Sequence, residues 1–330
     1  MSVAFETRRA KGGTASQAAA LRFAQVTPVL GAEVTGIDLR QELDAETVAA
    51  LRQGLLRRKV LYFRDQKITD AQQVRFTRYF GAVTPGHPII NGLREQPEIF
   101  GRTPADTRAE YGFRGISAAH PLRPARRAHA GRGWHIDITF VANPAAISIL
   151  RGVTIPETGG DTLFVDLEAL YEGLSAPLRT LVDGLQAIHV RDDEADGTPP
   201  EPRFDGRAPG PFAALHPLVR VHPETGKKVL YMSGFIQEID GLRGSESTAL
   251  LNFLSQELAG RQDLQARFRW TQDAIAVWDN RAIAHAGPID LAYIQGERLV
   301  NRTMVGGDLP VGPDGFVSRP LVGELFSTID

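Results

Sequence analysis

Two segments near the N-terminal end of the chain carry apolar residues at helical spacing. Within 45–58 the valine and leucine side chains recur three or four positions apart, which predicts a helix with one buried face. In the next segment, Thr69 and Gln72 match a capping box, in which each side chain accepts a hydrogen bond from the other residue's backbone N–H. We therefore expect a second helix that begins there and ends before Gly81.

The rest of the chain shows mostly the alternation and the short apolar runs that are typical of strands. At 216–222 apolar and polar residues alternate, and a turn at 223–226 leads to another apolar run at 228–233, which predicts a β-hairpin. We expect a β-rich α+β fold, with a closed or sandwiched antiparallel core and flanking helices mainly on the N-terminal side. The other expected elements are two short strands within 21–39 broken at Gly31, strands at 60–63, 134–140, 146–151, 161–165, 185–190, 266–270, 274–278 and 298–305, and helices at 175–184 and 245–259.

The pattern also suggests how the chain is divided. Residues 1–21 are polar, small and rich in Gly and Ala, so we expect a disordered tail there. Residues 22–330 are expected to form a single domain. Within that domain the segment 114–133 is rich in Arg, Ala, Gly and Pro and shows no periodicity. A long loop of this kind is typical of an active-site lid, and a solvated insertion with no role is the alternative.

Composition narrows the chemistry that is open to the chain. The 330 residues are 42% hydrophobic and carry a formal net charge of -2, so neither nucleic acid nor an anionic membrane is an expected partner. The absence of cysteine excludes disulfides, thiolate nucleophiles, iron–sulfur clusters and Cys-containing zinc sites. There is no signal-peptide pattern and no apolar run long enough to span a bilayer. We therefore expect a cytoplasmic protein in which any metal is held by His, Asp or Glu.

The sequence Trp134-His135-Ile136-Asp137 is the first candidate for metal chemistry. Side chains at i and i+2 of a strand point to the same face, so His135 and Asp137 can reach one metal ion. A second histidine would complete the two-His, one-carboxylate set of non-haem iron(II) oxygenases. Alone the motif is weak, because 8 His and 39 acidic residues produce about one such pair by chance. A surface pair is the commoner explanation of an isolated example.

The segment 277–285 supplies a second histidine, because an apolar strand there ends in a polar turn that leads to His285. The chain then returns with Arg298 and Arg302, which share a face if the segment is a strand. A planar guanidinium binds both oxygens of a carboxylate, so both arginines can serve one pocket; solvated arginines are the alternative. Thr162 lies at the start of a predicted strand, shortly after two glycines. Its hydroxyl can bind the same carboxylate as Arg298; the alternative is that the two glycines form an ordinary turn into the strand.

Taken in order, these pieces resemble the taurine dioxygenase (TauD/TfdA) family of iron(II)- and 2-oxoglutarate-dependent oxygenases. The resemblance extends from about Phe23 to Pro310 and implies a double-stranded β-helix, or jelly-roll, core. Two features depart from the family. The stretch between His285 and Arg298 is about two residues longer than expected, and 114–133 has no counterpart. The pieces that carry the resemblance are GAEVTGIDL, KVLYFRDQKIT, FGAVTPGHP, WHIDITF, ETGGDTLF, LHPLVRVHPETGKK and IAVWDNRAIAH.

The resemblance implies three iron ligands and a binding site for 2-oxoglutarate. His135, Asp137 and His285 would hold Fe(II), while Thr162 and Arg298 would bind the distal carboxylate of 2-oxoglutarate. The implied reaction consumes O2 and 2-oxoglutarate, releases succinate and CO2, and hydroxylates a C–H bond of a second substrate. The protein would contribute metal geometry, positioning and exclusion of bulk water.

The implied second substrate is a small or medium organic anion. Arg302 would lie near the cosubstrate or an anionic substrate group, and His87 would contact that group. A sulfonate, sulfate ester or aryloxyalkanoate would fit, and hydroxylation beside the heteroatom would cleave a C–S or C–O bond. The alternatives are a hydroxylase or desaturase of an amino acid or natural product, a non-catalytic jelly-roll binding protein, and a zinc hydrolase, for which no separate general base is evident. We expect a small-molecule substrate as the partner and a homo-oligomer as the assembly.

The remaining histidines and the tryptophans are weaker candidates. His189, His216 and His222 fall at strand ends or hairpin edges, so we expect structural roles for them. His120 and His129 fall in the predicted lid, where contact with substrate and simple solvation are both open. The three tryptophans are more typical of a core than of a cofactor platform.

Overall fold

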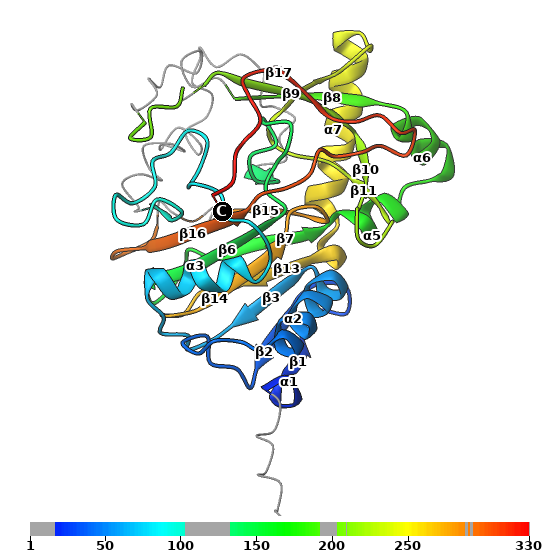
Figure 1. The fold of residues 1–330 in the computed structure, drawn as a ribbon. Helices are drawn as coiled ribbons and strands as arrows, with labels where there is room; N and C mark the ends of the chain where they lie inside the picture. The colour runs from blue at the N-terminus through cyan, green and yellow to red at the C-terminus, as the bar shows by residue number, and fades with distance from the viewer. Residues whose placement is uncertain are drawn as a thin grey trace, which may run out of the picture.

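The computed structural model (Figure 1) describes residues 17–102, 133–191, 203–208, 210–287, 290 and 293–329. The predicted lid, with His120 and His129, lies outside these described residues except for its last position. Most of the predicted tail also lies outside them, but its end forms a short helix, α1 (Gln17–Ala20). Helical structure therefore begins inside the segment for which we expected a tail. Among the described residues, no helix has the length and apolar character needed to cross a membrane.

The largest sheet has seven strands drawn from both ends of the described chain (Figure 1). Its order is β1 (Arg22–Gln25), β2 (Ala32–Thr35), β3 (Val60–Phe63), β14 (Ile275–Asp279), β6 (Ile147–Thr154), β16 (Leu299–Val305) and β4 (Phe100–Arg102). β2 and β3 run parallel, whereas β14 pairs antiparallel with β3 on one side and with β6 on the other. The N-terminal strands thus extend a sheet whose centre is formed much later in the sequence.

Two four-stranded sheets and a hairpin complete the strand structure of the described residues. One sheet has the order β13 (Gln265–Phe268), β7 (Thr162–Asp166), β15 (Ile283–Ala286) and β5 (Trp134–His135), and the other has the order β12 (Ile236–Ile239), β8 (Gln186–Arg191), β9 (Phe212–Pro217) and β17 (Arg319–Val322). The predicted hairpin is confirmed as β10 (Val219–Val221) paired with β11 (Lys228–Leu230). The predicted first strand at 216–222 is divided, however, because His216 and Pro217 belong to β9 and pair with β8. The expectation of a sheet-rich fold with flanking helices is therefore confirmed at this level.

The starts of three helices are fixed by capping side chains, one of which the sequence analysis predicted. α2 (Ala45–Arg58) starts after Asp44, whose side chain accepts a hydrogen bond from the N–H of Thr47. α3 (Asp70–Arg78) has the predicted capping box, with both hydrogen bonds between Thr69 and Gln72 present. The sequence analysis missed α5 (Leu167–Glu172), which follows β7 without a loop and is capped by the carboxylate of Asp166. The remaining helices are α6 (Ala176–Asp183), α7 (Gly244–Gly260) and the 3-10 turn η4 (Gln262–Leu264).

Buried apolar side chains fix these elements around the sheets. Leu51 and Leu55 of α2 and Phe76 of α3 pack against the seven-stranded sheet, where they meet residues such as Ile149 and Val277. A second buried cluster joins α7 to β7, β15 and the hairpin. Burial of apolar area is the main favourable term in folding. It therefore holds β6, β14 and β15, which carry parts of the site described below, in fixed positions.

The prediction of one strand over 134–140 is wrong in its second half. β5 ends at His135, and residues 137–140 form a turn. Ile138 has a φ of 48°, in the left-handed region that β-branched residues rarely adopt. Local sequence pattern did not reveal this change of direction, because alternation of apolar and polar residues continues through it.

Candidate metal centre and anion pocket

Three side chains that the sequence analysis proposed as metal ligands converge in the structure. One ligand atom from each of His135, Asp137 and His285 can be chosen so that all lie within 4.8 Å of one another. β5 and β15 are antiparallel neighbours in which His135 and His285 face each other directly. Their ring centroids are 4.2 Å apart. The Oδ1 atom of Asp137 lies 3.8 Å from Nε2 of His135 and 3.6 Å from Nε2 of His285.

Asp137 reaches this cluster by a different route from the one expected. The i, i+2 argument assumed a continuous strand, but the strand ends at His135 and the chain turns through Ile138. The turn, rather than strand alternation, brings the carboxylate beside the two imidazoles. The grouping of the three residues is as predicted, and the physical reason for it is corrected.

Asp137 is buried and held by hydrogen bonds from two distant segments. Ser148 Oγ donates to its Oδ2 at 2.6 Å, and Asn280 Nδ2 donates to the same Ser148 Oγ at 2.8 Å. The side-chain amide of Asn280 is itself fixed, because Trp278 Nε1 donates a hydrogen bond of 2.9 Å to Asn280 Oδ1. Arg302 Nη1 lies 2.5 Å from Asp137 Oδ1. This chain of contacts leaves the carboxylate little freedom to rotate.

Electrostatics keep this carboxylate ionised. Burial alone would raise the pKa of Asp137, but the charge of Arg302, the two imidazoles and the Ser148 hydrogen bond outweigh it and hold the pKa below its usual value. Burial, with added repulsion from His135 and Arg302, lowers the pKa of His285 well below its ordinary range. A neutral imidazole beside a carboxylate is the protonation state that metal ligation requires.

The histidine rings are arranged so that their Nε2 atoms face the cluster. His135 Nδ1 is 2.9 Å from the carbonyl oxygen of Gly133, a contact of the type that orients metal-binding histidines and leaves the other nitrogen for the metal. Both ring nitrogens of His285 are buried without a hydrogen-bond partner among the described residues. Buried polar atoms normally have partners. A divalent ion bound by two imidazoles and one carboxylate would give the Nε2 atom of His285 a partner, and this donor set suits iron(II).

Arg298, which the sequence analysis proposed for binding a carboxylate, is a buried cation. It is 5% exposed, and no carboxylate oxygen among the described residues lies within 4.0 Å of its guanidinium. Its Nε donates to the carbonyl oxygen of Gly160 at 3.3 Å. Gly160 has a φ of 76° and no space for a side chain, because a Cβ there would lie 2.8 Å from Arg298 Nε. Burial, and then repulsion from Arg302, lower the pKa of Arg298 to about 10, so it stays charged at neutral pH.

Thr162 lies at the start of β7, two residues after Gly160. Its buried hydroxyl accepts a hydrogen bond of 3.0 Å from Trp270 Nε1. Since the oxygen accepts from the indole, its own proton is available for another acceptor. The charged fork of Arg298 and this hydroxyl are the groups that a bound carboxylate needs.

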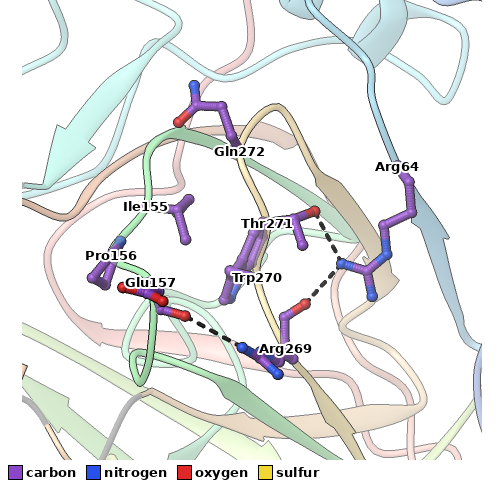
Figure 2. A pocket seen from close by; sticks show the side chains of 8 residues that line it. All are labelled: Arg64, Ile155, Pro156, Glu157, Arg269, Trp270, Thr271 and Gln272. Atoms are coloured by element: carbon purple, nitrogen blue, oxygen red, sulfur yellow. Dashed lines mark hydrogen bonds between the residues drawn. The ribbon is translucent and has the colours of Figure 1, made fainter.

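Trp270 also lines a surface pocket, with Arg64, Glu157 and Arg269 among its other residues (Figure 2). The pocket has a volume of about 370 Å³, and none of the three candidate metal ligands lines it. Figure 2 shows Arg64 donating to the carbonyl oxygen of Arg269 and to Thr271, and Arg269 donating to the carbonyl oxygen of Glu157. The arginines of this pocket are thus engaged in fixing loops, whereas Trp270 connects the pocket wall to Thr162.

His87 lies in the apolar wall near the cluster. It is half-buried, and its Nδ1 accepts a hydrogen bond from the N–H of Ile89 at 3.2 Å. Its ring centroid is 5.3 Å from that of Phe100. The guanidinium of Arg302 lies 5.8 Å from the centroid of the same phenylalanine. His87 and Arg302 therefore share Phe100 as a neighbour, and the geometry brings both predicted substrate residues to one region.

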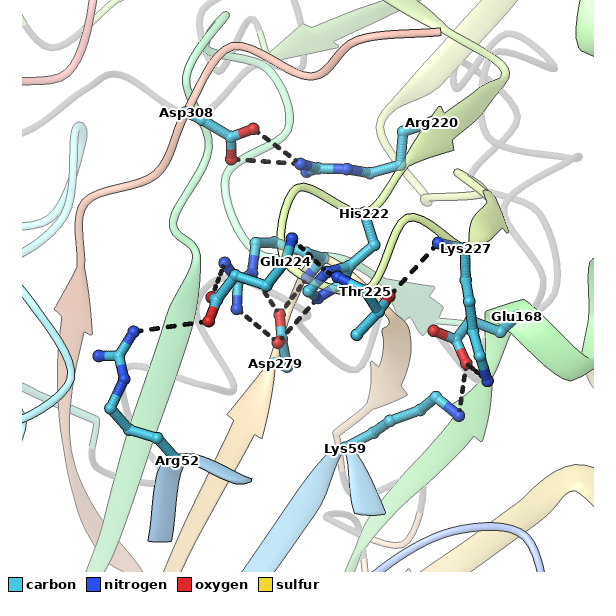
Figure 3. A network of polar contacts seen from close by, with 11 residues as sticks. Arg52, Lys59, Glu168, Arg220, His222, Glu224, Thr225, Lys227, Asp279 and Asp308 are labelled. Carbon is cyan, nitrogen blue, oxygen red and sulfur yellow. Dashed lines mark hydrogen bonds and ion pairs between the residues drawn. The ribbon is translucent and has the colours of Figure 1, made fainter. Parts of the chain in front are cut away.

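A buried ionic network supports the turn that carries Asn280. Arg281 binds Asp279 through two nitrogens and also contacts Glu224. His222 Nε2 lies 3.1 Å from Asp279 Oδ2. Figure 3 shows His222, Glu224 and Asp279 in this network, with Lys59 and Glu168 alongside. The expected structural role of His222 agrees with this arrangement, since the charges anchor both neighbours of Asn280.

Sequence analysis missed the residues that orient the predicted ligands. Ser148, Asn280 and Trp270 were not proposed, although each donates a hydrogen bond within the site. Serine, asparagine and tryptophan occur in many other positions, and no local pattern distinguishes these. The roles of Ser148 and Asn280 follow only from the sheet pairing that places β6 beside β14, and the role of Trp270 follows from the pairing of β13 with β7, which carries Thr162.

Comparison with known proteins adds a further set of findings. The model of the family described as "Taurine catabolism dioxygenase TauD, TfdA family" matches residues 22–304. The chain is 34% identical to an alkylsulfatase of Acinetobacter baylyi, over 91% of this chain and 89% of that protein. It is 33% identical to an alpha-ketoglutarate-dependent sulfate ester dioxygenase of Pseudomonas putida, over 93% and 96% of the two chains. The crystal structure of a taurine dioxygenase from Burkholderia xenovorans superposes with a TM-score of 0.78 at 39% identity, covering 92% and 96% of the two chains.

Proposed function

Because this chain belongs to the TauD/TfdA family of dioxygenases, we propose that it is the iron(II)- and 2-oxoglutarate-dependent oxygenase of an organic sulfate ester. The family's enzymes use Fe(II), 2-oxoglutarate and O2, and this enzyme is an alpha-ketoglutarate-dependent dioxygenase. The proposal assigns the metal to His135, Asp137 and His285. The observation that carries it is the convergence of these three side chains, together with a buried Arg298 that has no carboxylate within 4.0 Å among the described residues.

We propose the following division of work among the residues. When bound, iron(II) would activate O2, the oxidant, and 2-oxoglutarate would supply two electrons as it is converted to succinate and CO2, so that one oxygen atom enters a substrate C–H bond. Arg298 and the Thr162 hydroxyl bind the distal carboxylate of 2-oxoglutarate, and burial strengthens this contact by excluding water. Ser148 holds Asp137 in its ligating orientation, as supporting hydrogen bonds do in other metal sites.

The substrate proposal rests on the relatives and on the charge of the site. The alkylsulfatase and the sulfate ester dioxygenase match this chain over nearly its whole length. Arg302 supplies a cation beside the metal cluster, and His87 lies near it across Phe100. We propose that these two residues orient the sulfate group. Hydroxylation of the carbon next to the ester oxygen gives an unstable product, which loses sulfate and a proton and leaves an aldehyde.

The test is a substrate panel with two products measured. Purified enzyme with Fe(II) and 2-oxoglutarate is given medium-chain alkyl sulfates, alkyl sulfonates, aryloxyalkanoates and amino acids under air. We expect succinate and inorganic sulfate to form in equal amounts with an alkyl sulfate, and the Asp137→Ala variant to form neither. Succinate formation with another class and none with any alkyl sulfate would refute the substrate proposal and leave the oxygenase assignment standing.

We make further proposals about the fold, the location and the assembly of the enzyme. We propose that the sheets form the two sides of a double-stranded β-helix, and that residues 22–330 act as one domain; the family model spans nearly all of it. We also propose that the enzyme works in the cytoplasm on a small-molecule substrate and forms a homo-oligomer. Light scattering of the purified enzyme tests the last point, and a monomer mass at micromolar concentration would contradict it.

A further inference from the structure

The turn after β5 has a backbone conformation that the local sequence does not favour. Ile138 is 1% exposed and has a φ of 48°. A branched β-carbon is crowded in this left-handed region, and such a conformation persists only where the surrounding structure imposes it. Asp137 is the first residue of this turn. The contacts that impose the conformation of Ile138 therefore also determine where the Asp137 carboxylate points.

One side of the turn is fixed by the segment between β11 and β12. The N–H of Ile136 donates to Ser233 Oγ at 3.2 Å, and Ser233 Oγ donates to the Ile136 carbonyl at 3.4 Å. The N–H of Gly234 donates to the Trp134 carbonyl at 3.0 Å. Ser233 is 5% exposed, so water does not compete for these bonds. The residue between the two candidate ligands His135 and Asp137 is therefore held at both of its backbone polar groups.

The other side of the turn is fixed at Thr139, which is fully buried. Its Oγ1 donates to Ser233 Oγ at 3.0 Å and lies 2.9 Å from Nδ1 of His189. His216 Nε2 lies 2.7 Å from the Thr139 carbonyl oxygen. Both histidines are 0% exposed and come from β8 and β9 of the second four-stranded sheet. A different sheet from the one that carries His135 and His285 thus contacts the turn through its backbone and its hydroxyl.

Each hydrogen bond among His189, Thr139 and Ser233 can be assigned one donor and one acceptor without conflict. Burial, with repulsion from His216, lowers the pKa of His189 well below its ordinary value, so its ring is neutral. Because the Thr139 proton goes to Ser233, the Thr139 oxygen accepts from the Nδ1–H of His189. The His189 Nε2, which has no partner among the described residues, then carries the lone pair and needs no acceptor. Every donor in the chain is used, which favours one fixed arrangement.

We propose that Thr139, Ser233, His189 and His216 form a turn anchor that positions Asp137 for metal binding. These are positioning residues: they act on the backbone on either side of Asp137, whereas Ser148 contacts the carboxylate itself. The inference rests on the proposed function, because it takes Asp137 to be a metal ligand. It assigns two of the buried histidines a role in the site that the metal cluster alone does not indicate.

The experiment measures metal affinity and stability separately in the full-length protein. Mn(II) is titrated without 2-oxoglutarate, and the free ion is counted by electron paramagnetic resonance, so that no turnover is needed. Thr139→Val keeps the shape and removes the hydroxyl, and Thr139→Ser restores it. Thr77→Val is the matched control, because Thr77 is also fully buried and its hydroxyl donates to the Gln73 carbonyl at 2.8 Å in α3.

We expect Thr139→Val to raise the Mn(II) Kd about 10-fold or more, the usual range for loss of a supporting hydrogen bond around a metal site. Thr139→Ser should stay near the wild-type value. Thr77→Val should lower the Tm and leave the Kd unchanged. Ser233→Ala, which removes only one atom, should raise the Kd in the same direction and covers the case in which Thr139→Val does not fold.

Two outcomes would overturn the inference, and only the second would also overturn the assignment of Asp137 as a metal ligand. If wild type binds one Mn(II), Asp137→Ala loses it, and both Thr139→Val and Ser233→Ala bind as wild type does, the turn anchor is wrong and the metal site stands. If Asp137→Ala binds Mn(II) as tightly as wild type, both the metal assignment and the turn anchor fail.

Discussion

Replacement of Arg298 by lysine isolates the contribution of its planar fork to 2-oxoglutarate binding. The side chain is 5% exposed, and its Nε is committed to the Gly160 carbonyl. No carboxylate among the described residues lies within ion-pair distance. The remaining guanidinium nitrogens are therefore available for a carboxylate ligand. Lysine keeps the positive charge but presents one nitrogen in place of a fork.

The size of the effect follows from the hydrogen bond that is lost. A hydrogen bond to a charged group contributes about 1.5–3 kcal/mol, and about 1.4 kcal/mol corresponds to a tenfold change in affinity. Arg298→Lys should therefore raise the Kd for 2-oxoglutarate roughly 10- to 150-fold. The Mn(II) Kd should not change, because the hydrogen bond of Arg298 goes to the Gly160 carbonyl and not to any of the three candidate ligands.

The assay is an anaerobic titration of the Fe(II)-loaded protein with 2-oxoglutarate, followed by the visible absorption band of the complex. It needs no second substrate. Arg40→Lys serves as the control, because the Arg40 side chain is 62% exposed and paired with Asp38 on the surface. An unchanged Kd for 2-oxoglutarate in Arg298→Lys, together with a raised KM for the sulfate ester, would refute the assignment and exchange the roles of Arg298 and Arg302.

Two further predictions concern residues that the sequence alone did not point to. Trp270→Phe removes the hydrogen bond to Thr162. It should raise the Kd for 2-oxoglutarate roughly 2- to 13-fold, the range expected for one neutral hydrogen bond. An unchanged Kd in the same titration would show that the indole of Trp270 does not orient the Thr162 hydroxyl. Asp279→Asn should lower the free energy of unfolding at pH 7 by up to about 3–5 kcal/mol, because it removes the buried charge that binds two nitrogens of Arg281 and leaves Arg281 only its contact with Glu224. Burial alone would raise the pKa of Asp279, but Arg281 and His222 outweigh burial and hold this pKa below its usual value. The stabilisation by the Asp279 charge is therefore present above about pH 4 and is lost as the pH falls towards the pKa of Asp279 in the folded state. Urea unfolding should therefore show that the free energy of unfolding falls less between pH 7 and pH 3 in the variant than in wild type. An equal fall in both proteins would contradict the argument.

Local patterns in the sequence were sufficient for several elements. The capping box of Thr69 and Gln72 placed the start of α3, and the turn at 223–226 placed the hairpin of β10 and β11. Both signals depend on residues within a few positions of one another. By contrast, α5 was missed because it begins directly after β7, with no loop residues to mark the boundary.

The sequence by itself also determined which residues meet at the candidate site. His135, Asp137 and His285 were chosen by motif and by order along the chain, and the fold brings them within a few ångströms of one another. Arg298 and Arg302 were chosen from their spacing and from the resemblance. Arg298 is buried and has no carboxylate within ion-pair distance in the part of the chain that the structure describes, and Arg302 contacts Asp137.

Only the tertiary structure decided how these groups are held. The strand that was expected to align His135 with Asp137 ends between them, and the turn at Ile138 takes its place. Its supports come from residues far away in sequence: Ser233 is 94 positions from Thr139, and Asn280 is 143 positions from Asp137. Periodicity and capping reflect interactions over a few residues, whereas a buried hydrogen bond depends on which strands become neighbours. That choice is made by burial of the whole core, and no single segment of the sequence contains it.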